Sequence, residues 1–210
     1  GVLHRPKYPQ IAGVGQFRGH CFHSARWDHA VELEGKRIGI IGNGSTGVQI
    51  VSALAGKAAL LEHYVRTPQW IMPVENGYFS DEERAAFRDP EVLEAAMHFE
   101  EYNAAVERYT MAIVDMESEG AREMAAACLA NLEQNVTDPV LREKLRPDHI
   151  PLCKRLIFSP DYYQAIQHPA AALVTDDIQC VEETGIRPRD GRLHELDIIV
   201  LATGFHPDTF

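Results

Sequence analysis

The feature that most constrains this chain is a glycine-rich turn between an apolar segment and a segment of helical periodicity. Residues 36–41 end in a short apolar run, and Gly42-Asn43-Gly44-Ser45-Thr46-Gly47 follows directly. Apolar residues then recur at near-helical spacing up to Gly56, and a second apolar run covers 59–65. This order predicts strand, turn, helix and strand, a βαβ unit of an α/β fold.

The GxGxxG pattern in this position is typical of a dinucleotide-binding turn. Gly42 allows the tight turn, Gly44 lets a pyrophosphate approach the backbone, and Gly47 lets helix and strand pack closely. Free N–H groups at the start of the helix then face the phosphates. We therefore predict that residues 42–47, including Asn43, Ser45 and Thr46, bind a dinucleotide. A glycine turn without a ligand is the alternative.

The end of the second predicted strand bears on which dinucleotide binds. NAD and FAD sites have an acidic residue there for the ribose hydroxyls, whereas this chain has Arg66 followed by Thr67. An arginine can pair with a 2′-phosphate and a threonine hydroxyl can donate to it. The sequence therefore favours NADPH, with Glu62 as the competing ribose ligand and a plain surface charge as the alternative for Arg66.

The remaining patterns predict a Rossmann-like NADP(H)-binding domain with a helical insertion. The domain is expected over 35–74 and 149–205, where short apolar runs and a small antiparallel meander alternate with one short helix. Residues 75–148 are rich in Ala, Glu, Met and Leu and are expected to form the helical insertion. Residues 1–34 are interrupted by Pro and Gly and are expected to be an irregular linker.

Charge and composition exclude several classes of partner. The net charge of −11 argues against nucleic acid, which needs a basic face. No apolar run approaches the ~20 residues of a membrane helix, so no membrane partner is expected. Four cysteines without CxxC spacing and ten scattered histidines predict no metal site and favour a reducing, cytoplasmic location.

A second motif lies directly before the βαβ unit. Residues 17–28 fit FxGxxxHxxxW followed by Pro or Asp, with Phe17, Gly19, His23, Trp27 and Asp28 at the specified positions. This pattern resembles the fingerprint of type I Baeyer–Villiger monooxygenases, flavoenzymes that use NADPH and O2. The related flavin-containing monooxygenases have Tyr or Phe where this chain has Trp27.

Three further segments resemble the same family, so that the resemblance covers nearly the whole chain. They are Val65-Arg66-Thr67-Pro68-Gln69-Trp70, then Cys153-Lys154-Arg155-Leu156 with Asp161-Tyr162-Tyr163, and Ala202-Thr203-Gly204-Phe205. The resemblance implies that Arg66, Thr67 and Lys154 contact the 2′-phosphate. It also places Ala202, Thr203 and Gly204 at the cofactor-binding end of the last strand.

The resemblance implies an enzyme that converts ketones to esters or lactones with NADPH, FAD and O2. Arg155 is then the catalytic arginine, which stabilises negative charge during oxygen insertion. His23 is assigned with it to the catalytic set, through a conformational role at a hinge that it shares with Trp27.

The family's FAD-binding GxGxxG, expected well before the fingerprint, does not occur in these 210 residues. We therefore expect the chain to be the NADPH-binding middle of a larger flavoenzyme, with its FAD domain and the rest of the enzyme elsewhere. Two alternatives stay open: a flavin-containing monooxygenase acting on nitrogen or sulfur, and a stand-alone NADP(H)-binding module without turnover.

Overall fold

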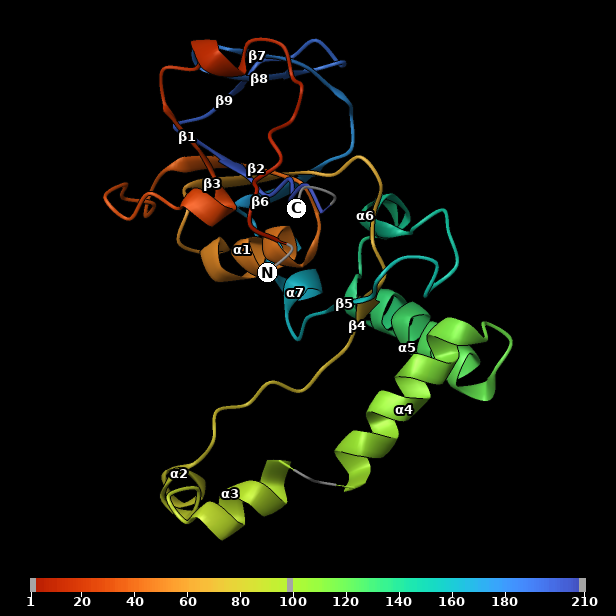
Figure 1. Ribbon diagram of the computed structural model, residues 1–210. Helices are drawn as coiled ribbons and strands as arrows, with labels where there is room; N and C mark the ends of the chain where they lie inside the picture. The colour runs from red at the N-terminus through yellow and green to blue at the C-terminus, as the bar shows by residue number, and fades with distance from the viewer. Residues whose placement is uncertain (1–2, 98–99, 208–210) are drawn as a thin grey trace. The chain divides into compact units, whose positions relative to one another are not determined.

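The computed structural model describes residues 3–97 and 100–207 and divides into two compact units (Figure 1). The first unit comprises 1–70, 132–148 and 161–210, and the second comprises 71–131 and 149–160. Residues 132–148, which we expected in the helical insertion, thus cluster with the first unit. Residues 149–160, which we expected in the nucleotide-binding domain, cluster with the second.

A parallel sheet of five strands organises the first unit. Its strands lie in the order β1-β10-β2-β3-β6, and every neighbouring pair is parallel. The central strands β10 and β2 are almost wholly apolar and buried, as expected of a parallel sheet covered on both faces. The α/β, Rossmann-like prediction is confirmed. The strand bounds are β1 His20–His23, β2 Arg37–Ile41, β3 Leu60–Tyr64, β6 Ala171–Val174 and β10 Ile198–Leu201.

Different layers cover the two faces of this sheet (Figure 1). Helices α1 (Ser45–Leu54) and α7 (Tyr162–Ile166) pack together on one face. An antiparallel meander of β7 (Ile178–Glu182), β8 (Gly185–Pro188) and β9 (His194–Glu195) covers the other. An apolar cluster joins meander and sheet, and it contains Ile41, Tyr64, Val181, Ile186, Leu196, Ile199 and Leu201.

The expectation that residues 1–34 are irregular is wrong at one place. His20–His23 forms β1, an edge strand parallel to β10, between two short 3-10 helices at Val14–Gln16 and Ser24–Arg26. The strand has four residues, and its partner follows about 180 positions later in the chain. No local periodicity could therefore reveal it.

The second unit is mainly helical, as predicted for its segment. It holds α2 (Asp81–Ala86), α3 (Pro90–Met97), α4 (Glu100–Val114) and most of α5 (Glu119–Asn135), and α6 (Pro139–Leu145) belongs to the first unit. Strands β4 (Ile71–Met72) and β5 (Ile157–Phe158) pair in parallel. Among the described residues, no helix has the length and apolar character that a bilayer-spanning helix requires.

Candidate nucleotide-binding site

The glycine turn, residues 42–47, joins the carboxyl end of β2 to α1. Gly42 has a φ of 107°, and a side chain there would overlap the Ala202 carbonyl at the end of the neighbouring strand β10. A Cβ at Gly47 would overlap the Gly42 carbonyl oxygen. Gly44, in contrast, has no atom within 4 Å of the place that a Cβ would occupy. Two glycines therefore serve the packing of the turn, and the third keeps its outer side open.

The open side of the turn is the amino end of α1. Gly44 is its N-cap residue and supplies no side-chain hydrogen bond to the helix. Backbone pairing begins where the Val48 N–H donates to the Gly44 carbonyl at 3.1 Å. Gly44, Ser45 and Thr46 are all exposed. An uncapped helix start with its N–H groups accessible fits an anionic group such as a pyrophosphate.

The segment after β3 is tied to this turn by one hydrogen bond. Asn43 Nδ2 donates to the Thr67 carbonyl oxygen at 2.7 Å. The side chain of Asn43 therefore holds two parts of the site together. Arg66 is exposed, and within the described residues its guanidinium enters no ion pair. A cation without a protein partner beside the glycine turn fits an anionic ligand.

Glu62 is excluded as the ribose ligand because the protein already uses its carboxylate. The Tyr64 hydroxyl donates to Glu62 Oε2 at 2.6 Å, and His194 Nδ1 lies 3.1 Å from the same oxygen. The carboxylate is buried beneath the meander. Burial, with help from Glu62, raises the pKa of Tyr64 and keeps this hydroxyl a donor.

The turn after β10 holds the predicted residues Ala202, Thr203 and Gly204. His23 Nδ1 accepts from the Ala25 N–H at 3.1 Å, so Nε2 carries the ring proton and donates to the Gly204 carbonyl at 3.0 Å. Burial lowers the pKa of His23, which favours this neutral ring. Both nitrogens of His23 are therefore engaged within the protein.

The outer side of this second turn is covered by the segment before the fingerprint. The Lys7 N–H donates to the Gly204 carbonyl at 2.9 Å, and Thr203 Oγ1 donates to the Lys7 carbonyl at 2.5 Å. The His23 ring also contacts Tyr8 and Phe205, with centroids 5.5 and 5.7 Å apart. The fingerprint histidine thus joins β1, β10 and the N-terminal segment.

Other fingerprint residues also have packing roles in β1. A Cβ at Gly19 would overlap both the Asp197 carbonyl and the Phe17 ring, so glycine permits β1 to begin beside β10. The Trp27 ring packs edge-on against Phe22 at a centroid distance of 5.1 Å. The motif therefore specifies how β1 docks on the sheet.

Lys154 and Arg155 belong to the second unit, directly before β5. Both side chains are exposed, and no ion pair engages them within the described part of the chain. The structure thus brings the glycine turn, Arg66, Thr67 and residues 202–204 together in the first unit. It places the predicted lysine and catalytic arginine in the other unit.

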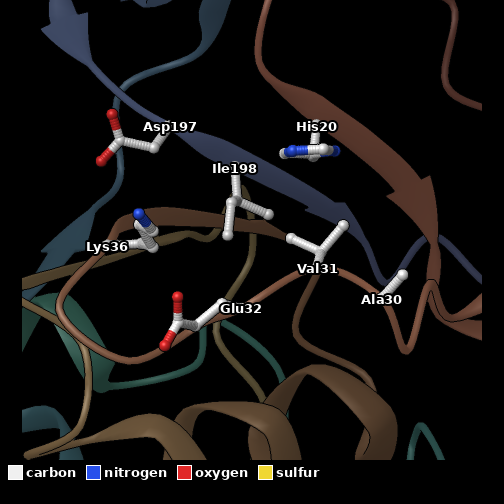
Figure 2. A pocket seen from close by; sticks show the side chains of 7 residues that line it. All are labelled: His20, Ala30, Val31, Glu32, Lys36, Asp197 and Ile198. Carbon is white, nitrogen blue, oxygen red and sulfur yellow. The ribbon is translucent and has the colours of Figure 1, made fainter.

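A surface pocket of about 350 Å³ lies at the opposite, amino end of the parallel strands. Figure 2 shows the side chains that line it, among them Ile198, Asp197, Lys36 and Glu32. Arg37 binds both oxygens of Asp197, with Nη2 2.8 Å from Oδ1. This pocket is distinct from the glycine turn, and the Asp197 carboxylate in its lining is already paired with Arg37.

The motifs and the fold agree with comparisons to known proteins. Residues 1–109 match the family model described as flavin-binding monooxygenase-like, and the chain belongs to that family. An uncharacterized monooxygenase of Mycobacterium tuberculosis (strain ATCC 25618 / H37Rv) is 45% identical over 210 residues, which are 100% of this chain and 42% of that protein. A Baeyer-Villiger monooxygenase of Pseudomonas aeruginosa is 33% identical over 98% of this chain and 38% of its own length.

Solved structures give the same result. A cyclohexanone monooxygenase from Rhodococcus sp. Phi1 bound to NADP+ matches with a TM-score of 0.80 and 30% identity, over 98% of this chain and 45% of that chain. A structure of OTEMO in complex with FAD and NADP matches with a TM-score of 0.79, 30% identity and coverage of 98% and 46%. The resemblance to Baeyer–Villiger monooxygenases is confirmed, and the chain spans less than half the length of these relatives.

Proposed function

We propose that this chain is the NADPH-binding portion of an FAD-dependent monooxygenase that inserts oxygen into ketones to give esters or lactones. One observation carries the proposal. The start of α1 is uncapped, and there is open space next to its N-cap residue Gly44. The hydrogen bond from Asn43 to Thr67 holds the segment that contains exposed Arg66 next to this helix start. The turn suits a pyrophosphate, and the neighbouring cation suits the additional phosphate of NADPH.

The preference for NADPH follows from the positive charge of Arg66 and from the hydrogen bonding of Glu62 within the protein. A carboxylate that binds ribose hydroxyls would repel a 2′-phosphate, but Glu62 is buried and hydrogen-bonded to Tyr64. Arg66 presents a planar set of donors that matches a phosphate. Thr67 and Lys154 are proposed to complete this contact, as the family resemblance implies. Residues 202–204 are proposed to border the cofactor at the end of β10.

When bound, NADPH and FAD would supply the redox chemistry that activates O2. The residues of this chain bind and orient the nucleotide. The guanidinium of Arg155 can stabilise negative charge that develops on oxygen. His23 is proposed to serve as a linker residue, because both its nitrogens already bond to the backbone.

Two kinds of relatives support this assignment. Some sequence relatives are named Baeyer-Villiger monooxygenases, and some of the similar solved structures contain FAD or NADP. FAD and NADP occupy the OTEMO structure, and ε-caprolactone, a lactone, occupies a cyclohexanone monooxygenase of TM-score 0.80 and 29% identity. A ketone and O2 are therefore the proposed substrates, and the rest of the flavoenzyme is the proposed partner. We also propose a cytoplasmic location, from the cysteine pattern.

The binding test is titration of the 210-residue chain with NADPH and NADH, in which we expect the tighter affinity for NADPH. The test of the reaction is the full-length protein with NADPH and cyclic ketones, with ester and hydrogen peroxide measured on one sample. Arg155→Ala is expected to lower ester formation about 10²–10³-fold. Arg155→Lys is the matched variant that keeps the charge but loses the planar donors. Exclusive oxidation of amines or sulfides, or no turnover, would contradict the proposal.

A further inference from the structure

A buried histidine lies directly behind the glycine turn and is not part of either motif. His63, in the middle of β3, has no exposed surface. Its Nε2 lies 3.1 Å from the Gly42 carbonyl oxygen, and its Nδ1 lies 3.0 Å from the Tyr162 hydroxyl oxygen on α7. The ring of Tyr162 meets the imidazole edge-on at a centroid distance of 5.7 Å. All three residues belong to the first unit.

The partners define the protonation of His63. A carbonyl oxygen can only accept, so Nε2 must carry a proton and donate to Gly42. Burial lowers the pKa of His63 to about 4, and the ring is therefore neutral at pH 7 with a lone pair on Nδ1. Burial also raises the pKa of Tyr162, so that its hydroxyl stays protonated and donates to Nδ1. The hydroxyl of Tyr162 thus selects the tautomer that binds the turn.

This hydrogen bond orients a whole peptide unit. The described residues contain no cis peptide bond, and in a trans unit the carbonyl and the following N–H point in opposite directions. With the Gly42 carbonyl held against β3, the Asn43 N–H points away from the sheet interior. Gly47 leaves room for the same carbonyl, because a Cβ there would overlap it.

The Tyr64 carbonyl accepts from the Gly42 N–H at 3.2 Å, and the hydrogen bond from His63 fixes the carbonyl side of the same residue. Gly42 has a φ of 107°, and glycine tolerates several neighbouring conformations at small cost. A rotated peptide would turn a carbonyl toward the side on which Gly44 lies open. A carbonyl oxygen would repel the phosphates that an N–H attracts. The direction of this peptide therefore affects how strongly the turn attracts an anion, beside the N–H groups at the start of α1.

We propose that His63, aligned by Tyr162, is a positioning residue that holds the Gly42–Asn43 peptide with its N–H toward the pyrophosphate of the bound dinucleotide. The proposal rests on the proposed function of the chain as an NADPH-binding unit. Since the pyrophosphate is common to both nucleotides, His63 should affect NADPH and NADH equally. This separates its role from that of Arg66, which should affect NADPH alone.

The test compares dissociation constants for NADPH and NADH in five forms of the 210-residue chain at a temperature where circular dichroism shows each to be folded. His63→Leu removes both hydrogen bonds and should weaken both nucleotides about tenfold. His63→Gln retains an N–H donor and an oxygen acceptor and should restore most of the affinity. Tyr162→Phe should weaken both nucleotides about threefold. Tyr163→Phe, the same change at the adjacent buried tyrosine, should leave both affinities unchanged.

The outcomes separate this proposal from the one on which it rests. Unchanged affinities in folded His63→Leu, or a loss confined to NADPH, would overturn the role of His63 while leaving NADPH binding intact. If the unaltered chain binds neither nucleotide, the proposed function fails and the role of His63 fails with it. If His63→Leu does not fold, Tyr162→Phe decides: an affinity equal to that of Tyr163→Phe overturns the proposal.

Discussion

The turns that follow the neighbouring strands β2 and β10 are supported in the same way, by a histidine that donates to a glycine carbonyl. Each contains a glycine with positive φ, Gly42 at 107° and Gly204 at 76°. Each glycine carbonyl accepts from Nε2 of a buried histidine, His63 in the first turn and His23 in the second. In each case Nδ1 accepts a hydrogen bond from another group of the protein. The two histidines are thus neutral supports for two backbone carbonyls.

The outer sides of the two turns differ. The side-chain positions of Gly44 in the first turn and of Gly204 in the second both have no atom within 4 Å, but their hydrogen-bond partners differ. In the second turn, Lys7 donates its N–H to Gly204 and accepts from Thr203. The same support therefore serves one turn that opens an uncapped helix, which suits an anionic ligand, and one turn that is hydrogen-bonded to another segment of the chain. The groups left without protein partners, more than the shape of the turn, identify the binding site.

The largest expected effect is a loss of stability in acid that depends mainly on His63. Its pKa of about 4 when folded lies below the ordinary 6.5 of the unfolded chain. Stability from this group is present above pH 6.5 and is lost as the pH falls toward 4, at a cost of about 3 kcal/mol. His23 has a lowered pKa and acts in the same direction.

Urea unfolding at a series of pH values measures this loss. His63→Gln should flatten the pH dependence more than His23→Gln, because burial lowers the pKa of His63 as far as about 4. If the free energy of unfolding depends on pH equally in the unaltered chain and in His63→Gln, another group takes up the proton on unfolding.

The next effect tests whether Arg66, in the segment after β3 that Asn43 holds to the glycine turn, binds a phosphate. Arg66→Ala should weaken NADPH about ten- to a hundredfold, since a hydrogen bond to a charged group contributes about 1.5–3 kcal/mol, and should leave NADH nearly unchanged. Arg189→Ala is the control: it removes an exposed arginine that pairs with Asp177 at 3.5 Å. Calorimetric titration measures both nucleotides. Equal losses for NADPH and NADH would mean that Arg66 does not contact the 2′-phosphate.

Two alanine substitutions separate packing from ligand access within the first turn. Gly47→Ala should destabilise the fold by about 1–3 kcal/mol, because its Cβ overlaps the Gly42 carbonyl. Gly44→Ala meets open space at a φ of −68° and should leave stability nearly unchanged, yet it should weaken both nucleotides. Thermal unfolding and nucleotide titration on the same samples check this pair. A stable Gly47→Ala variant would contradict the packing role.

The smallest effect is expected in the acidic helices, where neither turn is involved. Glu91→Lys and Glu94→Lys change exposed residues of α3. Surface changes of this kind usually stay within about 0.5 kcal/mol, so stability and nucleotide affinity should hardly move. A large loss of NADPH affinity in either variant would show that this segment takes part in binding.

Local patterns in the sequence were enough to predict the βαβ unit and its motif. The apolar runs at 36–41 and 59–65 and the helix between them follow from spacing within about 30 residues. The capping box that Ser80 and Glu83 form at the start of α2 depends on the same kind of local spacing, since the two residues lie three positions apart. The family also followed from sequence, because its fingerprint is a contiguous pattern.

The tertiary structure alone decided which of the candidate groups are free to bind a ligand. From the sequence, Glu62 is a plausible ligand of the ribose and Arg66 a plausible ligand of the phosphate. In the structure, however, Tyr64 and His194 already hydrogen-bond to the Glu62 carboxylate. His63 lies 99 residues from Tyr162, so no local pattern marks it. Strand β1 likewise depends on β10. Sequence spacing determines the conformation of a segment through neighbouring residues, whereas the availability of a polar group depends on partners brought close only by folding.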